Sequence, residues 1–253
     1  MNGFYPAVAG ALAQDRRLEI LTANLANANT PGFKASIPVF RTFLSGTSTP
    51  GVLPVGDFSR PGIQPLDSDA MGWISSSVVD LRPGDIKQTG SALDLAIDGE
   101  GFFAIRTSQG ERYTRGGNFT RKATGELVTQ DGSPVLGING GPIRLGPGEM
   151  TVSDNGGITV EGNPAGTLKV VTFKNPQLLE KAGEGLLNLR EGTPDLVPAQ
   201  TLRVRQGYLE NSNVSVVEQL TGMITTLRAF EAYQKVIQSH DEVTGKSIEI
   251  GRI

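Results

Sequence analysis

A narrow apolar stripe near the N-terminus places the strongest constraint on how this chain can fold. Leu18, Leu21 and Leu25 follow one another at spacings of three and four residues, so they lie on one face of a helix. The alanines between them favour the helix and keep it thin. Asn24 and Asn27 lie beside this stripe rather than in it. A stripe this narrow is typical of a helix that packs on other helices at close range.

The sequence predicts an abrupt end to this first helix, which we place over residues 4–29. Pro31 disfavours the helical conformation at Thr30, and Gly32 permits a turn. Phe33 follows as a bulky apolar residue just after the stop. We therefore expect these four residues to set the direction in which the chain leaves the helix.

The C-terminal part of the chain predicts a second amphipathic helix. Ser215 is a suitable N-cap residue, and Glu218 three residues later completes a capping box. Gly245 is predicted to end or fray this helix. Apolar side chains recur along it, mostly at spacings of three, four and seven residues, at Leu220, Met223, Ile224, Leu227, Phe230, Tyr233 and Ile237. The two aromatic residues would also suit the core of an isolated chain, but a similar stripe at both chain ends favours packing between helices.

The middle of the chain predicts a β-rich domain. The sequence contains 33 Gly and 15 Pro, which imply many turns between short strands. The clearest strand signals are Leu93–Asp98, Phe102–Arg106 and Glu111–Thr114, and Asp131–Gly132 is a hairpin-type turn. Short strands separated by Gly-rich turns are typical of a compact sandwich or barrel.

These elements together predict an α+β chain in four parts. Residues 1–44 form an N-terminal helical assembly segment, in which Pro38 leaves the final residues open between helix and strand. Residues 45–73 form a linker rich in Ser, Gly and Pro, and residues 74–200 form the central β-rich domain, with a loop region from residue 183. Residues 201–253 form a C-terminal helical assembly segment. The two terminal helices are predicted to pair antiparallel as a coiled-coil-like domain, because the chain leaves along one and returns along the other.

The sequence lacks most of the residues that common catalytic and metal-binding sites require. His240 is the only histidine and there is no cysteine, so a catalytic triad or a zinc site would have few ligands to use. Gly245-Lys246-Ser247 matches half of a phosphate-binding loop, but His240 stands where the first glycine is required. We therefore predict no catalytic residue, no cofactor-binding residue and no metal site, and no small-molecule substrate.

Charge and hydropathy argue against two further classes of protein, those that bind nucleic acid and those that span a membrane. The net charge is −3, from 23 basic and 26 acidic residues, which argues against a nucleic-acid partner. No run of residues is long and apolar enough to span a membrane. The apolar residues 4–13 precede the first basic residue, Arg16, so they are predicted to begin the first helix rather than to form a signal peptide.

Three stretches of the sequence resemble the bacterial flagellar rod and hook protein family. The first is residues 23–34, Ala-Asn-Leu-Ala-Asn-Ala-Asn-Thr-Pro-Gly-Phe-Lys, which resembles the family's N-terminal signature. The second is the middle of the chain, in particular residues 93–103, 113–119 and 125–129. The third is Gly207-Tyr-Leu-Glu-Asn-Ser-Asn-Val214 with the helix after it, which resembles the C-terminal signature. Within the family, residues 172–181 resemble the proximal-rod member more than the distal-rod member.

The resemblance implies a structural subunit of the flagellar basal-body rod, located in the part of the rod that crosses the periplasm. Such proteins are exported unfolded through the flagellar export apparatus and assemble with copies of themselves and with other rod proteins. The terminal helices would form the inner wall of the axial tube, and the β domain would face outward. We therefore predict an assembly interface at Leu18, Leu21, Asn24, Leu25, Asn27, Thr30, Pro31, Gly32, Phe33, Leu220, Met223, Ile224, Leu227, Phe230, Tyr233 and Ile237.

Two alternatives stay open at this point. The first is a distal-rod subunit of the same family. The second is a secreted β-rich protein that binds or cleaves cell-wall glycan, which would need a cleft with two acidic side chains. Carboxylate pairs such as Asp94 with Asp98, or Asp67 with Asp69, are present, but nothing in the sequence distinguishes them from solvated surface residues.

Overall fold

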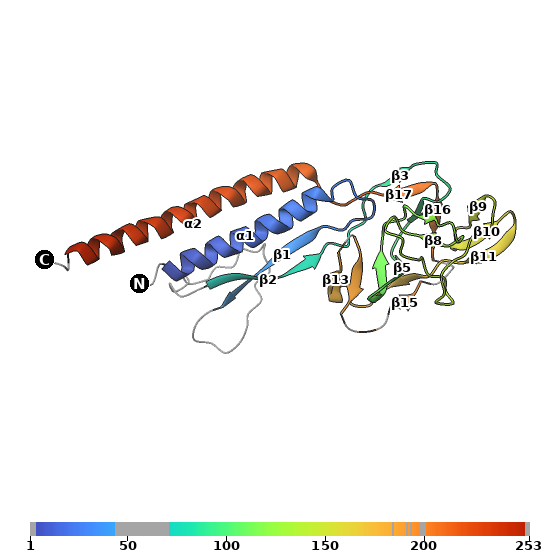
Figure 1. Ribbon diagram of the computed structural model, residues 1–253, viewed down its shortest axis with the longest axis horizontal. Helices are drawn as coiled ribbons and strands as arrows, with labels where there is room; N and C mark the ends of the chain where they lie inside the picture. The colour runs from blue at the N-terminus through green and yellow to red at the C-terminus, as the bar shows by residue number, and fades with distance from the viewer. Residues whose placement is uncertain are drawn as a thin grey trace, which may run out of the picture. The chain divides into compact units, whose positions relative to one another are not determined.

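The computed structural model of the protein divides into two compact units (Figure 1). The first unit combines residues 1–25, 36–78 and 215–253, and the second combines residues 26–35 and 79–214. The structure describes residues 4–43, 71–183, 185–190, 192, 194–197 and 201–250. Of the predicted linker 45–73, residues 45–70 lie outside these described residues, and residues 71–73 begin a strand.

The first unit is built from two long helices and a two-stranded sheet. Helix α1 spans Phe4–Ala26 and helix α2 spans Val216–Ile250. A side-chain carbon placed on Gly10 would meet the Tyr233 ring, and one placed on Gly222 would meet Leu21. Early residues of α1 therefore face late residues of α2, so the two helices run antiparallel alongside each other, as Figure 1 also shows. Strands β1 (Ser36–Phe43) and β2 (Met71–Val79) form the sheet.

Both predicted helices exist, but their ends differ from the predicted ones. Helix α1 ends at Ala26 rather than at residue 29, because the backbone turns at once and Thr30 donates its N–H to the Asn27 carbonyl (3.1 Å). Helix α2 continues through Gly245 to Ile250, since one glycine inside a helix costs only about 1 kcal/mol. At its start Ser215 caps the helix as predicted, accepting the Glu218 N–H (3.4 Å).

The sequence left the end of the N-terminal segment open between helix and strand, and the structure places residues 37–43 in a strand. Pro38 lies inside β1, in a two-stranded sheet where each strand has an unpaired edge that tolerates a missing N–H. The partner strand begins at Met71, three residues before the predicted start of β structure.

The second unit is β-rich, as predicted, and its largest element is a six-stranded antiparallel sheet. Its strand order is β13-β14-β6-β5-β12-β15. The predicted strands at residues 102–106 and 111–114 form its central hairpin, β5 (Phe102–Thr107) and β6 (Gly110–Thr114). The others are β12 (Val170–Thr172), β13 (Leu179–Lys181), β14 (Leu187–Leu189) and β15 (Asp195–Leu196), and a short 3-10 helix, η1 (Pro176–Leu178), precedes β13.

Smaller sheets complete the second unit. Strands β9 (Met150–Val152), β10 (Gly157–Val160) and β11 (Asn163–Thr167) form a three-stranded meander. Strand β4 (Leu95–Ile97) pairs with β16 (Val204–Gln206), and β3 (Ile86–Gln88) pairs with β17 (Tyr208–Glu210). Strand β7 (Thr120–Arg121) pairs with β8 (Leu127–Val128), and the predicted turn at Asp131–Gly132 follows β8, with Gly132 donating its N–H to the Thr129 carbonyl.

The six-stranded sheet is buried on both faces. In β5, Phe103 and Ile105 belong to one hydrophobic cluster, whereas Phe102 and Ala104 belong to a second. The sheet therefore forms the middle layer of this unit, because successive side chains of a strand point to opposite faces.

The predicted loop over residues 183–200 contains strands β14 and β15. Strand β14 pairs with β13 through Leu179 opposite Leu189, and β15 pairs with β12. Each has three residues or fewer, too short for an alternating pattern to be detected in the sequence. Within the described part of the chain, no helix has the length and apolarity required to cross a membrane.

Candidate functional site: the helix surface and the signature junction

Helix α2 presents two different faces. Met223, Phe230, Tyr233 and Ile237 are half-buried, and Thr226 between them is 1% exposed. Tyr233 lies against Gly10 of α1, so closely that a side-chain carbon on that glycine would come within 2.5 Å of the ring. This face of α2 is therefore the one that packs on α1.

The other face of α2 carries apolar side chains exposed to solvent. Val217, Leu220, Ile224 and Leu227 follow one another at spacings of three and four residues and are between 42% and 74% exposed. We call these four residues the outer row. The single interface predicted for this helix is thus divided, because α1 covers only one side of it. Leu220, Ile224 and Leu227 lie in the outer row, whereas the other predicted residues of α2 lie on the inner side.

The predicted interface residues of α1 are more enclosed. Leu21 is buried against Gly222, and Leu18 and Leu25 are half-buried. Asn24 is 1% exposed, and its Oδ1 accepts the Ser36 N–H (2.8 Å). Its Nδ2 donates to the Ser36 carbonyl (2.9 Å) and to Oε1 of Gln219 (3.3 Å). One amide therefore connects α1, the start of β1 and the first turns of α2.

The remaining predicted interface residues lie in the second unit. The Asn27 side chain accepts a hydrogen bond from the Thr30 hydroxyl (3.2 Å), and Pro31 leads into Gly32, which has a φ of +68°. Gly32 donates its N–H to the Glu210 carbonyl (2.7 Å). Phe33 is buried, with the Lys181 ammonium 3.8 Å from its ring centroid. Within this chain, residues 30–33 are therefore held by contacts inside the β-rich unit.

A buried cluster of charged side chains lies beside this turn. Lys34, Arg115 and Glu210 are each 5% exposed or less. Nζ of Lys34 lies 2.6 Å from Oε1 of Glu210, and Nη1 of Arg115 lies 3.4 Å from Oε2. Sequence reasoning did not single out these three residues. A signal was present, because each lies in one of the stretches that carry the family resemblance, residues 23–34, 113–119 and 207–214.

Backbone groups add further hydrogen bonds to this cluster, although the buried Nε of Arg115 has no hydrogen-bond partner among the described residues. Lys34 also donates to the Arg82 carbonyl (2.7 Å), and Glu210 Oε1 also accepts the Gly84 N–H (3.0 Å). Arg115 donates to the carbonyls of Ile97 and Gly99. Burial lowers the pKa of Lys34 despite the opposing effect of Glu210, and burial likewise lowers the pKa of Arg115. We call Lys34, Arg115 and Glu210 the signature junction.

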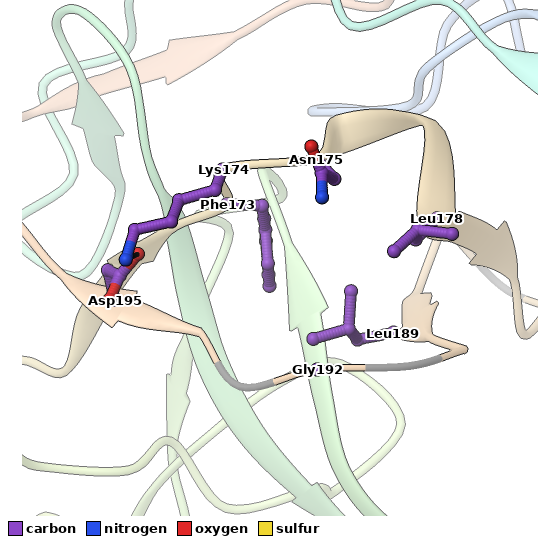
Figure 2. Close-up of a pocket in the computed structure, with 7 residues that line it drawn as sticks. All are labelled: Phe173, Lys174, Asn175, Leu178, Leu189, Gly192 and Asp195. Atoms are coloured by element: carbon purple, nitrogen blue, oxygen red, sulfur yellow. Dashed lines mark ion pairs between the residues drawn. The ribbon is translucent and has the colours of Figure 1, made fainter.

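The second unit also has a surface hollow of about 380 Å³, shown in Figure 2. Phe173, Leu178 and Leu189 give it an apolar lining, and Lys174 and Asp195 lie at one side. Among the described lining residues Asp195 is the single carboxylate, and its Oδ2 lies 3.6 Å from the Lys174 ammonium. Glycoside cleavage generally requires two carboxyl groups that flank the scissile bond, whereas the described residues around this hollow provide one.

The fold and the site together define a class of protein: a chain with a long helix near each end and a β-rich unit between them in the sequence, in which one helix leaves a row of apolar side chains exposed. Three family models match the chain. They describe a flagella basal body rod protein (residues 4–34), the D1 domain of the flagellar hook proteins FlgE/F/G (residues 96–163) and the C-terminal part of the flagellar basal body rod FlgEFG proteins (residues 205–250).

Similar proteins match over nearly the whole chain. The flagellar basal-body rod protein FlgG of Bacillus subtilis (strain 168) is 33% identical over all of both chains. FlgF of Caulobacter vibrioides (strain ATCC 19089 / CIP 103742 / CB 15) is 32% identical over 100% of this chain and 99% of its own. FlgF of Escherichia coli (strain K12) is 34% identical over 98% of each. The chain belongs to the family of flagellar basal-body rod proteins. It is a structural component of the rod of the flagellar basal body, and not an enzyme.

Proposed function

We propose that this protein is a proximal-rod subunit that polymerises through its terminal helices into the axial tube of the flagellum. The outer row of α2 carries this proposal, because it leaves four apolar side chains in solvent at helical spacing. Residues 172–181 favour the proximal rod over the distal rod. The relatives named FlgF and FlgG have similar sequence identities to the chain, 32–34%. Overall identity therefore does not separate the two rod types, and the proposal of a proximal-rod subunit rests on residues 172–181.

The proposed partners are copies of this chain, other rod and hook proteins of the flagellum, and the flagellar export apparatus. Contacts between successive subunits of a rod are heterologous, and a rotation that does not close produces a helical tube. Each side chain of the outer row would bury against a neighbour, and full burial of a Leu or Ile side chain contributes about 1.5–3 kcal/mol. Four such side chains per subunit are a substantial driving force for assembly.

The pairing of the two helices would orient this surface. We propose a coiled-coil-like antiparallel pair, supported by the approach of Gly10 to Tyr233 and of Gly222 to Leu21. The buried amide of Asn24 would set the register of this pair, as single buried polar residues do in coiled coils. The outer row then points away from α1, toward a neighbouring subunit.

Replacement of Leu227 by Asp tests this function. We expect Leu227→Asp to prevent incorporation into basal bodies and to abolish motility, because a carboxylate in the outer row cannot be buried without a partner. Thr225→Asp is the matched control, since Thr225 is exposed on the same helix but lies outside the outer row. Incorporation is measured by immunoblotting of purified basal bodies, and circular dichroism verifies that the β-rich unit is folded. Normal incorporation of Leu227→Asp would overturn the proposal.

A further inference from the structure

Residues 27–35 belong to the β-rich unit although the chain then leaves this unit for residues 36–78. The backbone of this segment is hydrogen-bonded to the rest of the unit at both of its edges. Gly32 donates its N–H to the Glu210 carbonyl (2.7 Å), and Ala35 donates its N–H to Oδ1 of Asn213 (2.8 Å). The Ala35 carbonyl accepts the Asp80 N–H (2.8 Å). The segment is thus held in the way that a domain holds a bound peptide.

Side chains of the segment add specific contacts. Lys34 inserts its ammonium between Glu210 and the Arg82 carbonyl, at 2.6 and 2.7 Å. Phe33 is buried beneath Lys181. A side-chain carbon at Gly32 would come 2.1 Å from the Gly116 nitrogen, so the site accepts only glycine there. The arrangement therefore selects Gly, Phe and Lys at three successive positions.

Neither of the two hydrophobic clusters of the unit includes this segment, although Phe33 and Ala35 are buried. Every residue of the two core clusters, with the partly buried residues packed against them, lies between Val79 and Val204. The strands of the six-stranded sheet also lie within residues 79–214. The continuous stretch 79–214 therefore holds both described clusters of the unit, and residues 27–35 add hydrogen bonds, a buried ion pair and the buried side chains of Phe33 and Ala35 beside them.

We propose that residues 79–214 form a peptide-binding socket, and that its ligand is the Pro-Gly-Phe-Lys segment of the same chain, residues 27–35. The core of the socket folds first, and the segment docks onto it in a later, separable step. Docking connects the two ends of the chain, because the segment directly follows α1 while Glu210 and Asn213 shortly precede α2. This goes beyond the assembly role of the outer row and does not depend on it.

Hydrogen exchange on the full-length Gly32→Val variant tests the separability of docking. A valine at this position prevents docking by steric clash. We expect the amides of Asp80 and Asn213, which are hydrogen-bonded to Ala35 and Phe33, to exchange at least about tenfold faster than in the unmodified protein. The core amides of Ala104 and Leu136 should keep their protection. If the core amides lose protection to the same degree, or if none of the four amides changes, the proposal is wrong.

A synthetic peptide of residues 26–36 tests whether the segment is the ligand. Added to Gly32→Val, the peptide should restore the protection of Asp80 and Asn213, because the socket of that variant is empty. The same peptide with Lys34→Ala should not restore it, and the unmodified protein, whose own segment fills the socket, should bind little peptide. Failure of the peptide to restore protection at millimolar concentration, or equal restoration by the Lys34→Ala peptide, would overturn the assignment of the ligand.

Discussion

At the scale of single residues, the direction of the Lys34–Glu210 ion pair is determined by the backbone around it. The Arg82 carbonyl accepts a hydrogen bond from Lys34, whereas the Gly84 N–H donates one to Glu210. An ammonium therefore fits only the first position, and a carboxylate only the second. The pair differs in this respect from a surface ion pair, in which the acidic and the basic residue can swap positions because solvent surrounds both.

Exchange of the two charges is the test of this asymmetry. Glu210→Gln should destabilise the β-rich unit by about 3 kcal/mol, because it leaves a buried charge without its partner. The double variant Lys34→Glu with Glu210→Lys should be no more stable than Glu210→Gln. In the double variant the new carboxylate faces a backbone carbonyl, and the new ammonium faces a backbone N–H. Urea denaturation measures the free energy of unfolding of both variants.

The exposed pair Arg205–Asp98 is the matched control for this exchange. Its side chains are 52% and 36% exposed, and exchange of its charges should cost less than about 1 kcal/mol. Recovery of the unmodified stability by the buried double exchange would contradict the proposed role of the backbone.

Residue-scale prediction from the sequence succeeded for the helix cap and was incomplete for buried polar positions. Ser215 was recognisable because its role depends on neighbours in the sequence. The sequence placed Asn24 beside the apolar stripe, but the structure shows that its side chain is buried. This burial was not predicted, because Ser36, to which Asn24 is hydrogen-bonded, lies beyond the turn. The signature junction joins residues far apart in the chain, so only the resemblance of their surrounding stretches indicated them.

At the scale of secondary structure elements, periodicity predicted that α2 is amphipathic but not which neighbours its apolar faces meet. The predicted interface residues of α2 extend around more than one side of the helix. Only the fold reveals that α1 covers the side with Phe230 and Tyr233 and leaves Leu220 and Leu227 exposed. The shortest strands were missed for a related reason: their pairing depends on partners distant in the sequence.

Two glycines test the packing of α1 on α2. Gly10→Ala should weaken this packing, because the added carbon would lie 2.5 Å from the Tyr233 ring. Gly245→Ala, the matched control in α2, meets nothing within 4 Å and should stabilise the helix by up to about 1 kcal/mol. Thermal melting followed by circular dichroism at 222 nm compares the two variants, and equal helix stability in both would contradict close contact at Gly10.

At the scale of the whole molecule, the two units differ in how much of their stability comes from within the chain. The β-rich unit has two buried clusters of its own. The helical unit leaves the outer row of α2 in solvent, and the end of α2 continues past the described start of α1 (Figure 1). Isolated helices are marginal in water without tertiary packing. We therefore expect the helical unit to be the less stable of the two in a free subunit.

This difference predicts that helix formation is coupled to assembly. In a free subunit, the helix content should fall short of the 23 residues of α1 and 35 residues of α2, and amides beyond His240 should exchange fastest. In basal bodies, the same amides should be protected, because neighbouring subunits bury the outer row and the exposed end of α2. Circular dichroism of the free subunit and hydrogen exchange in both states measure this change. A free subunit with both helices fully formed and already protected would mean that assembly joins rigid helices, and the outer row would then contribute contact area without contributing to folding.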